Sequence, residues 1–119
     1  FAEVEGFSKF GSYTGNGSTD GPYLHCGFRP AFVMVKKFDV AEGWFVTDNK
    51  INPYNVASGW LRAESTAVEA SEVHMDMVAN GFKIRSSGGN HNTSSGTYIY
   101  MAFAEFPFGG SGVAQARAR

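Results

Sequence analysis

The glycine-rich stretch at residues 11–30, GSYTGNGSTDGPYLHCGFRP, is the part of the chain whose composition most suggests ligand chemistry. Glycine loops beside strands cradle phosphates when their backbone N–H groups are free. A P-loop, however, runs through Gly-Lys-Ser/Thr into a helix, and this stretch lacks that Lys and places Pro22 where the helix would begin. No βαβ pattern surrounds it, as a dinucleotide site would require. Because Asn16-Gly17 tolerates a positive φ, we predict a structural turn between two strands.

The histidines raise the possibility of a metal site, since imidazole and carboxylate groups are common metal ligands. His74 and Asp76 share one face of a predicted strand, and His91 lies in a polar loop. The same alternation is the default for a strand with one solvated face, so we expect that arrangement and no metal. His25 and Cys26 are adjacent and point to opposite faces of a strand. The single cysteine forms no internal disulfide, and we expect it to pack as a small apolar group.

Catalytic patterns are weak in this sequence. No Gly-x-Ser-x-Gly nucleophile elbow is present, and glycoside hydrolysis would need two carboxylates facing each other across a cleft. Glu105 lies within the apolar sequence AFAEFPF, where burial requires a partner, which we expect to be an Arg or a Lys. No pattern pairs the available carboxylates, so we assign no catalytic residue and expect no enzyme. These carboxylates are Asp48, Glu64, Asp76 and Glu105.

Two long polar segments, 49–60 and 86–97, offer rings and amides that suit a glycan. Aromatic faces stack on sugars by the same apolar contact that packs cores, while amides donate hydrogen bonds. Trp44 lies in a predicted strand and is expected in the core, whereas Trp60 follows a loop-like stretch. A ligand site would bring the two segments together at a free surface tip. The candidate ligand contacts are Tyr54, Asn55, Trp60, Asn90, His91 and Asn92.

The composition limits the class of protein. The 119 residues include 43% hydrophobic and only 18% charged side chains, with 15 glycines, which fits a single loop-rich β domain. The net charge of −1 and the absence of a basic stripe argue against a nucleic-acid partner. No apolar run is long enough for a membrane-spanning helix, and we expect no membrane insertion, cofactor or signal peptide. The 11 phenylalanines exceed the needs of a small core and indicate an interface.

Short strands separated by turn residues predict an all-β fold, an antiparallel β-sandwich of jelly-roll or concanavalin-like lectin type. Asn80-Gly81 and the turn before Gly43 predict hairpins. Apolar residues on both faces of 96–108 predict a central strand covered on both sides. We place one domain at residues 1–109 and a flexible or subunit-docking tail at 110–119. The predicted strands are 6–14, 22–28, 31–39, 43–48, 60–64, 72–79, 81–86 and 96–108.

Five short motifs follow one another along the chain: YTGNG (13–17), GFRP (27–30), GWFVTD (43–48), NGFKIR (80–85) and GTYIYMAFAEFPF (96–108). Taken in this order, they resemble a surface module of tailed-bacteriophage virion proteins, and the resemblance covers nearly the whole chain. The resemblance implies a lectin-like β-sandwich in a tail fibre or spike, with a structural or host-adhesion role and no catalytic set. The start at Phe1 fits a piece processed from a longer fibre protein.

From this resemblance we expect a virion protein, assembled in the host cytoplasm, that contacts other virion proteins and host surface polysaccharide. We expect a homo-oligomer, a trimer by analogy with phage fibres, with a subunit interface at the two-sided strand 97–108. One alternative is a capsid decoration or other assembly protein with no ligand. A glycan-degrading enzyme is a third reading, and it fails if the four carboxylates are dispersed or ion-paired.

Overall fold

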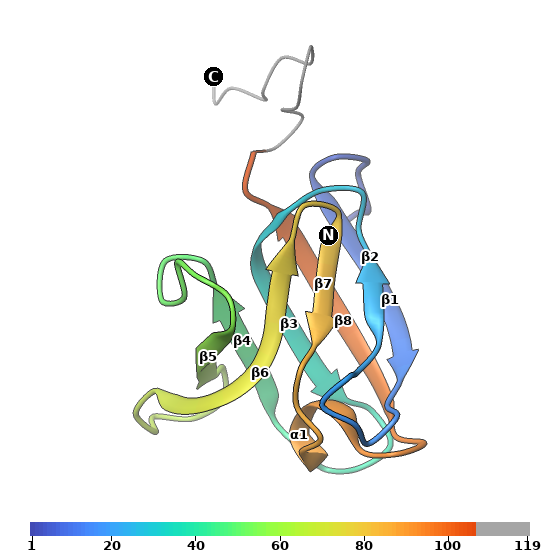
Figure 1. Ribbon diagram of the computed structural model, residues 1–119, viewed down its shortest axis with the longest axis vertical. Coiled ribbons are helices and arrows are strands. Elements are labelled where there is room, and N and C mark those ends of the chain that lie inside the picture. Colours follow the sequence, from blue (N-terminus) through green and yellow to red (C-terminus); the bar gives the residue numbers. More distant parts are fainter. Residues whose placement is uncertain (107–119) are drawn as a thin grey trace.

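The structure is a computed structural model, and it describes residues 1–106. Eight strands and one short helix follow each other along the chain, and Figure 1 shows their arrangement. The strands expected from the sequence are all present, although the fifth begins three residues earlier than predicted. The elements are β1 (Ser8–Thr14), β2 (Tyr23–His25), β3 (Pro30–Lys37), β4 (Trp44–Asp48), β5 (Ala57–Arg62), β6 (Ala70–Val78), β7 (Gly81–Ile84), α1 (Gly89–Asn92) and β8 (Thr97–Ala104).

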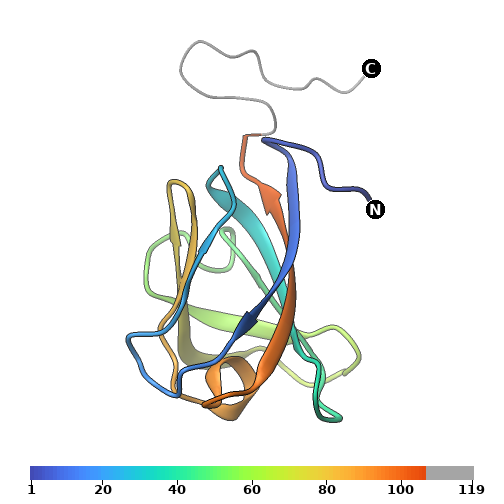
Figure 2. The same cartoon turned by 90° about the vertical axis from the view of Figure 1, so that its right-hand side faces the viewer.

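All strand pairs are antiparallel, in the order β1-β8-β3-β4-β5-β6-β7-β2. The sheet curls until its two ends approach each other, which gives a nearly closed, barrel-like sandwich. Figure 2 shows its two layers edge-on, with β2, β6 and β7 on one side and β1 and β8 on the other. The predicted all-β antiparallel sandwich is therefore confirmed. Residues 107–109 of the predicted domain and the predicted tail 110–119 lie outside the described residues.

Both predicted hairpins are present. β3 pairs with β4, and β6 pairs with β7 through Val78↔Gly81. The role of Gly81 differs from the prediction, because it is the first residue of β7 and not a left-handed turn residue. A Cβ at this position would lie 2.0 Å from the carbonyl oxygen of Leu24. Glycine is therefore needed here to let β2 lie close against β7.

The glycine-rich loop between β1 and β2 is not a tight hairpin. β1 pairs only with β8, and β2 pairs only with β7, at the two opposite ends of the strand order. The loop 15–22 therefore bridges the seam where the curled sheet nearly meets itself. Gly17 has φ 69°, so the predicted positive φ at Asn16-Gly17 is confirmed.

The core lies between the two layers and is filled by one continuous cluster of side chains. The Tyr13 and Tyr98 rings stack with centroids 4.9 Å apart, and the Phe82 ring meets Tyr100 edge-on at 5.2 Å. Cys26 belongs to this cluster, as predicted. The other members are Phe28, Val33, Val35, Ala57, Met75, Met77, Ile84, Ala102 and Ala104.

α1 closes one end of the barrel (Figures 1 and 2). The core tyrosines reach it with their hydroxyls, because Tyr98 Oη donates to the Gly89 carbonyl at 2.7 Å and Tyr13 Oη donates to the His91 carbonyl at 2.7 Å. The expectation that the polar segment 86–97 forms part of a free surface tip is wrong for its central residues. His91 and Asn92 are buried, with 2% and 0% exposure, because they fill the end of the barrel, which the strands leave open.

β8 lies between β1 and β3, so its predicted central position is confirmed. Its side chains are buried on one face and only half-buried on the other, so the prediction of a strand covered on both sides is wrong. Directly after β8, Glu105 binds the Arg29 side chain, with Nε 3.1 Å from Oε2, and accepts a hydrogen bond from Asn49 Nδ2 at 2.9 Å. The predicted basic partner of Glu105 is thus Arg29. Within residues 1–106, no helix is long and apolar enough to cross a membrane.

Candidate functional site

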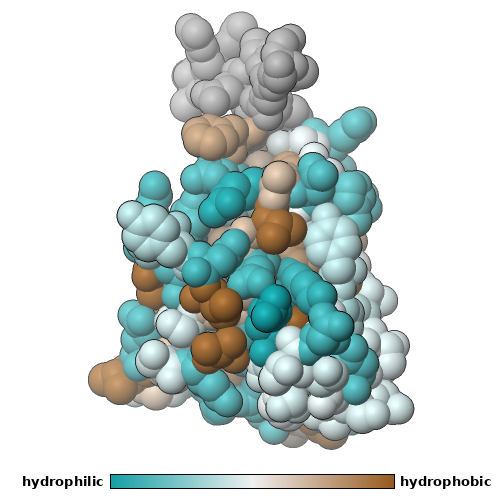
Figure 3. Space-filling view, viewed as in Figure 1, coloured by the Kyte–Doolittle hydropathy of each residue, from teal (hydrophilic) through white to brown (hydrophobic). Residues whose placement is uncertain are grey.

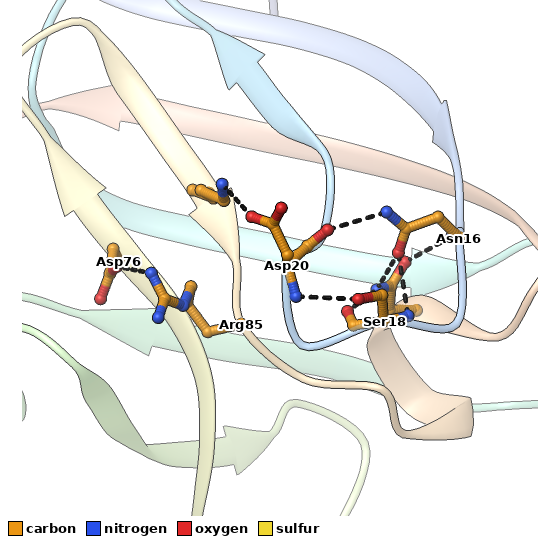
Figure 4. A network of polar contacts seen from close by, with 7 residues as sticks. Asn16, Ser18, Asp20, Asp76 and Arg85 are labelled. Atoms are coloured by element: carbon orange, nitrogen blue, oxygen red, sulfur yellow. Dashed lines mark hydrogen bonds and ion pairs between the residues drawn. The ribbon is translucent and has the colours of Figure 1, made fainter.

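The glycine-rich loop uses its own backbone donors, so it offers little to a phosphate. Asn16 N–H donates to Asn92 Oδ1 at 2.8 Å, and Gly17 N–H donates to the Asn92 carbonyl at 2.9 Å. Ser18 N–H donates to Asn16 Oδ1 at 3.0 Å. Asp20 adds a carboxylate that pairs with a Lys side chain of β7 (Figure 4). The loop is therefore a structural bridge across the seam.

The side-chain amide of Asn92 is the centre of this network. Its Nδ2, which carries two hydrogens, lies within hydrogen-bond distance of three acceptors: Asn16 Oδ1 at 2.8 Å, the Ser18 carbonyl at 2.7 Å and the Ser86 carbonyl at 2.9 Å. Its Oδ1 accepts from the Asn16 backbone, as described above. Because all its polar atoms are occupied and its exposure is 0%, Asn92 has nothing left for a surface ligand.

The loop at 49–56 is stabilised in a similar way. Asn55 Nδ2 donates to the Met77 carbonyl at 2.7 Å, and Asn55 Oδ1 accepts from Met77 N–H at 2.9 Å, so its amide extends the pairing of β6. Asn52 Oδ1 likewise accepts from Gly59 N–H at 2.7 Å. Tyr54 differs from both because its side chain is 83% exposed. It is the candidate ligand residue that is most available to a partner.

Four rings that are distant in the sequence meet beside α1. The His74 and His91 rings stack with centroids 5.0 Å apart, and the Phe45 ring lies 4.8 Å from His91. Trp60 contacts His91 edge-on at 6.0 Å. The Arg62 guanidinium covers the Phe45 ring at 5.2 Å. We call His74, His91, Phe45 and Trp60 the buried ring cluster.

The electrostatics of the buried ring cluster favour neutral imidazoles. Burial lowers the pKa of His74 to about 4, although the hydrogen bond of Nδ1 with the Glu72 carbonyl raises it. Burial, with a smaller effect from His74, lowers the pKa of His91 to about 3. His74 Nε2 bonds to the Thr47 hydroxyl, whereas His91 Nε2 and Trp60 Nε1 have no hydrogen-bond partner. The prediction of a solvated face for His74 is wrong, because β6 turns this side chain inward.

The six candidate ligand residues thus separate into two groups. Trp60, His91 and Asn92 are buried near one another, beside α1 at the closed end of the barrel. The loop between β4 and β5, to which Tyr54 and Asn55 belong, lies well away from α1 in Figures 1 and 2. Asn90 is half-buried on α1. The two polar segments therefore do not meet at one tip.

His74, Asp76 and His91, the three side chains considered as metal ligands, do not all come together in the structure. His74 and His91 come together, but Asp76 binds Arg85, with Nη1 3.2 Å from Oδ2 (Figure 4). In the described part of the chain, no three His, Cys, Asp or Glu side chains are placed to hold a metal ion.

The four carboxylates considered for glycan hydrolysis have separate partners. Asp76 and Glu105 bind arginines, as described above. Asp48 Oδ1 accepts from Lys50 N–H at 2.7 Å, and Glu64 Oε2 accepts from Trp44 N–H at 2.9 Å. This hydrogen bond lowers the pKa of the Glu64 carboxyl. The dispersed arrangement gives the hydrolase reading no support.

A pocket of about 440 Å³ opens at the seam, between the start of β1 and the end of β2. Its charged groups partly neutralise one another, because Lys9 Nζ lies 2.7 Å from Glu3 Oε1. Burial raises the pKa of the Cys26 thiol to about 11, so this wall of the pocket does not supply a reactive thiolate at neutral pH. The lining residues are Glu3, Glu5, Ser8, Lys9, His25, Cys26 and Gly27.

The most unusual surface lies on the outside of β1, β8, β3, β4 and β5. A sheet with one solvated face normally carries polar side chains there, yet here many outward residues are large, apolar and only partly buried, with Ser12, Lys36 and Asp48 among the polar exceptions. The opposite layer, formed by β2, β6 and β7, has a mostly hydrophilic surface with separate hydrophobic patches (Figure 3). We call the following set the outer apolar face: Phe10, Phe32, Met34, Trp44, Val46, Leu61, Ile99, Met101 and Phe103.

The structure places the two tryptophans opposite to the expectations from the sequence. Trp60, expected near a ligand loop, is 7% exposed inside the barrel. Trp44, expected in the core, lies half-buried on the outer apolar face with Lys36 Nζ 5.6 Å from its ring. Both are strand residues, and the sequence around each has no clear alternation that would assign its side. The stacked histidines were also missed, since no spacing rule links β6 to α1.

Comparison with known proteins gives one match. The family model described as a domain of unknown function, DUF7483, matches residues 1–107. No curated protein and no solved structure matches the chain.

The Asn92 network predicts a large loss of stability when its donors are removed. Asn92→Asp keeps the size of the side chain but loses the Nδ2 donor and buries a carboxylate among carbonyl oxygens, so we expect the free energy of unfolding to fall by about 3 kcal/mol or more. Asn90→Asp, two residues earlier on α1, should change it by less than about 0.5 kcal/mol. Urea unfolding measures both, and equal losses would contradict the network.

The buried ring cluster predicts acid sensitivity. Above pH ~6.5 both histidines are neutral in the folded and unfolded chains, so they cause no pH dependence there. As the pH falls towards the folded pKa values of about 4 and about 3, only the unfolded chain takes up these protons, and stability is lost.

We therefore expect the His74→Gln/His91→Gln double variant to lose roughly 5 kcal/mol less stability than the parent between pH ~7 and pH ~4.5, because each buried histidine contributes about 1.4 kcal/mol per pH unit below its unfolded pKa. His25→Gln, at an exposed position, is the control and should follow the parent. The measurement is urea unfolding at both pH values, with NMR titration of the imidazoles. An unchanged acid loss in the double variant would count against the buried, neutral histidines.

Proposed function

This chain belongs to the DUF7483 family, and on that premise we propose that it is a non-enzymatic structural domain of a tailed-bacteriophage virion, of the tail-fibre or spike kind. The order of the five short motifs suggests the phage setting. The outer apolar face is the observation that carries a structural role, because half-exposed large apolar residues over several strands are a mark of a surface used in assembly.

The internal use of the polar loops supports the same proposal. Enzyme sites keep polar groups poised towards a cavity, with shifted pKa values that suit proton transfer. Here the amides of Asn55 and Asn92 bind backbone groups, and the carboxylates of Asp76 and Glu105 bind arginines. These polar groups stabilise a scaffold and do not converge on a substrate.

The proposal places the protein on the particle surface, after assembly in the host cytoplasm, in contact with other virion proteins. Mass spectrometry of purified particles should detect the chain, and immunogold electron microscopy should locate it on a fibre or spike. Label on the capsid lattice would favour the alternative of a decoration protein. A chain that is expressed in infected cells but absent from particles would overturn the virion role.

Attachment to host surface polysaccharide is a second function, favoured by the exposed ring of Tyr54. The Tyr54 ring is 83% exposed, and hydrogen bonds of Asn52 and Asn55 fix the loop that carries it. The ring is therefore available for stacking on a sugar. Weak contacts of this kind gain avidity when several copies act together.

For this function we expect the purified domain to bind a polysaccharide on a glycan array. Tyr54→Ala should weaken that binding about tenfold, which is the scale of one truncated aromatic contact. Phe38→Ala is the control, since Phe38 is also an exposed ring at 67% but lies in the loop between β3 and β4. Equal weakening by both variants, or no signal across host polysaccharides, would argue for assembly without adhesion.

A further inference from the structure

We infer that the outer apolar face is the surface through which a second copy of this chain packs. The inference deepens the proposed structural function and rests on it, because it names the partner of a surface whose exposure motivated that function. Three observations support it, namely a continuous apolar row across the sheet, a group of phenylalanine rings beside it and the charge balance around it.

The apolar row follows directly from the strand register. Phe10 of β1 pairs with Met101 of β8, which pairs in turn with Met34 of β3. Met34 pairs with Val46 of β4, and Val46 pairs with Leu61 of β5. Paired residues of antiparallel strands share a face, so five adjacent strands present one uninterrupted apolar row. At ~4.8 Å between strands, the row is roughly 19 Å long.

Rings extend the row towards the chain ends. Phe103 is surrounded by Phe1, Phe7, Phe10 and Phe32, and the four ring centroids lie 5.9, 6.0, 6.1 and 5.9 Å from its own. Phe103 itself is only half-buried despite these neighbours. On the other side of the row, Ile99 of β8 adds an apolar side chain between Ser12 of β1 and Lys36 of β3, and Lys36 in turn pairs with Trp44 of β4. Three rows two residues apart span roughly 14 Å along the strands.

The charges around the face point to a neutral partner. Lys9 pairs with Glu3 at 2.7 Å, Arg29 with Glu105 at 3.1 Å, and Lys37 with Asp39 at 3.8 Å. Two other cations lie on these strands: Lys36 lies over the Trp44 ring and donates to the Glu42 carbonyl, and Arg62 of β5 lies over the Phe45 and Trp60 rings.

A face bordered by neutralised charges does not attract a polyanion or a strongly charged protein. A second copy presents the same balance of charge and the same apolar centre, so the two faces meet without like-charge repulsion. An apolar patch of this size also corresponds to the centre of a standard interface, in which roughly 800 Å² per partner is buried and the rim is polar.

The test is the mass of the protein in solution, measured by sedimentation as a function of concentration. The parent chain should form a reversible oligomer. Met101→Glu places a charge in the middle of the row, at a half-exposed position that the folded monomer tolerates, and should raise the dissociation constant at least ~30-fold. Val68→Glu introduces the same charge at a loop residue that is 90% exposed and should change nothing.

Leu61→Glu gives a second variant in case Met101→Glu fails to fold. Leu61 is 38% exposed at the end of the row, so its replacement spares the monomer while still weakening the oligomer. A parent chain that stays monomeric at every concentration would overturn the inference, and so would an oligomer that survives both variants.

These outcomes are separable from those of the virion proposal. A monomeric parent that is nevertheless found on the particle would remove the second copy as partner and leave the structural role in place. A chain that forms the oligomer in solution but is absent from particles would support the second copy as partner and remove the virion role.

Discussion

The fold depends on closing the seam between β1 and β2, which stand at opposite ends of the sheet and do not pair with each other. The amide of Asn92 performs this closure. It binds loop 15–22 through Asn16 and Ser18 and the end of β7 through Ser86, with no exposure to solvent. Since buried polar groups are costly when unpaired, one side chain that satisfies several loop atoms makes the bridged seam stable.

The buried ring cluster follows from the same closure. Holding Asn92 inside the barrel end forces its neighbour His91 inward, where it stacks on His74 and meets Trp60. Both imidazoles lose their solvation and remain neutral, and His91 Nε2 is left without a hydrogen-bond partner. The histidines therefore belong to the plug that fills the barrel, and the part of the molecule available to partners is its outer surface.

The sequence predicted which segments form strands and which of them pair in hairpins. It did not predict the face of the sheet on which each side chain lies. The hairpins, the positive φ at Gly17, the central position of β8 and the basic partner of Glu105 were all predictable, because each depends on turn chemistry, strand patterning or the cost of a buried charge. The faces of the sheet on which Trp44 and Trp60 lie were not predictable, because a register shift of one residue moves every side chain to the other face. The burial of His74 was missed because the β5–β6 pairing is irregular between Ala57 and Gly59, and the neighbours His74 and Met75 are both buried.

The amino-acid sequence by itself determined an antiparallel all-β domain with an excess of phenylalanine beyond the needs of a core. Only the tertiary structure decided where the surplus apolar residues lie, because that depends on the order β1-β8-β3-β4-β5, which brings residues from distant segments into one row. It also decided that His91 and Asn92 are interior. A polar loop becomes buried when the curled sheet leaves an open end, and local composition carries no information about that gap.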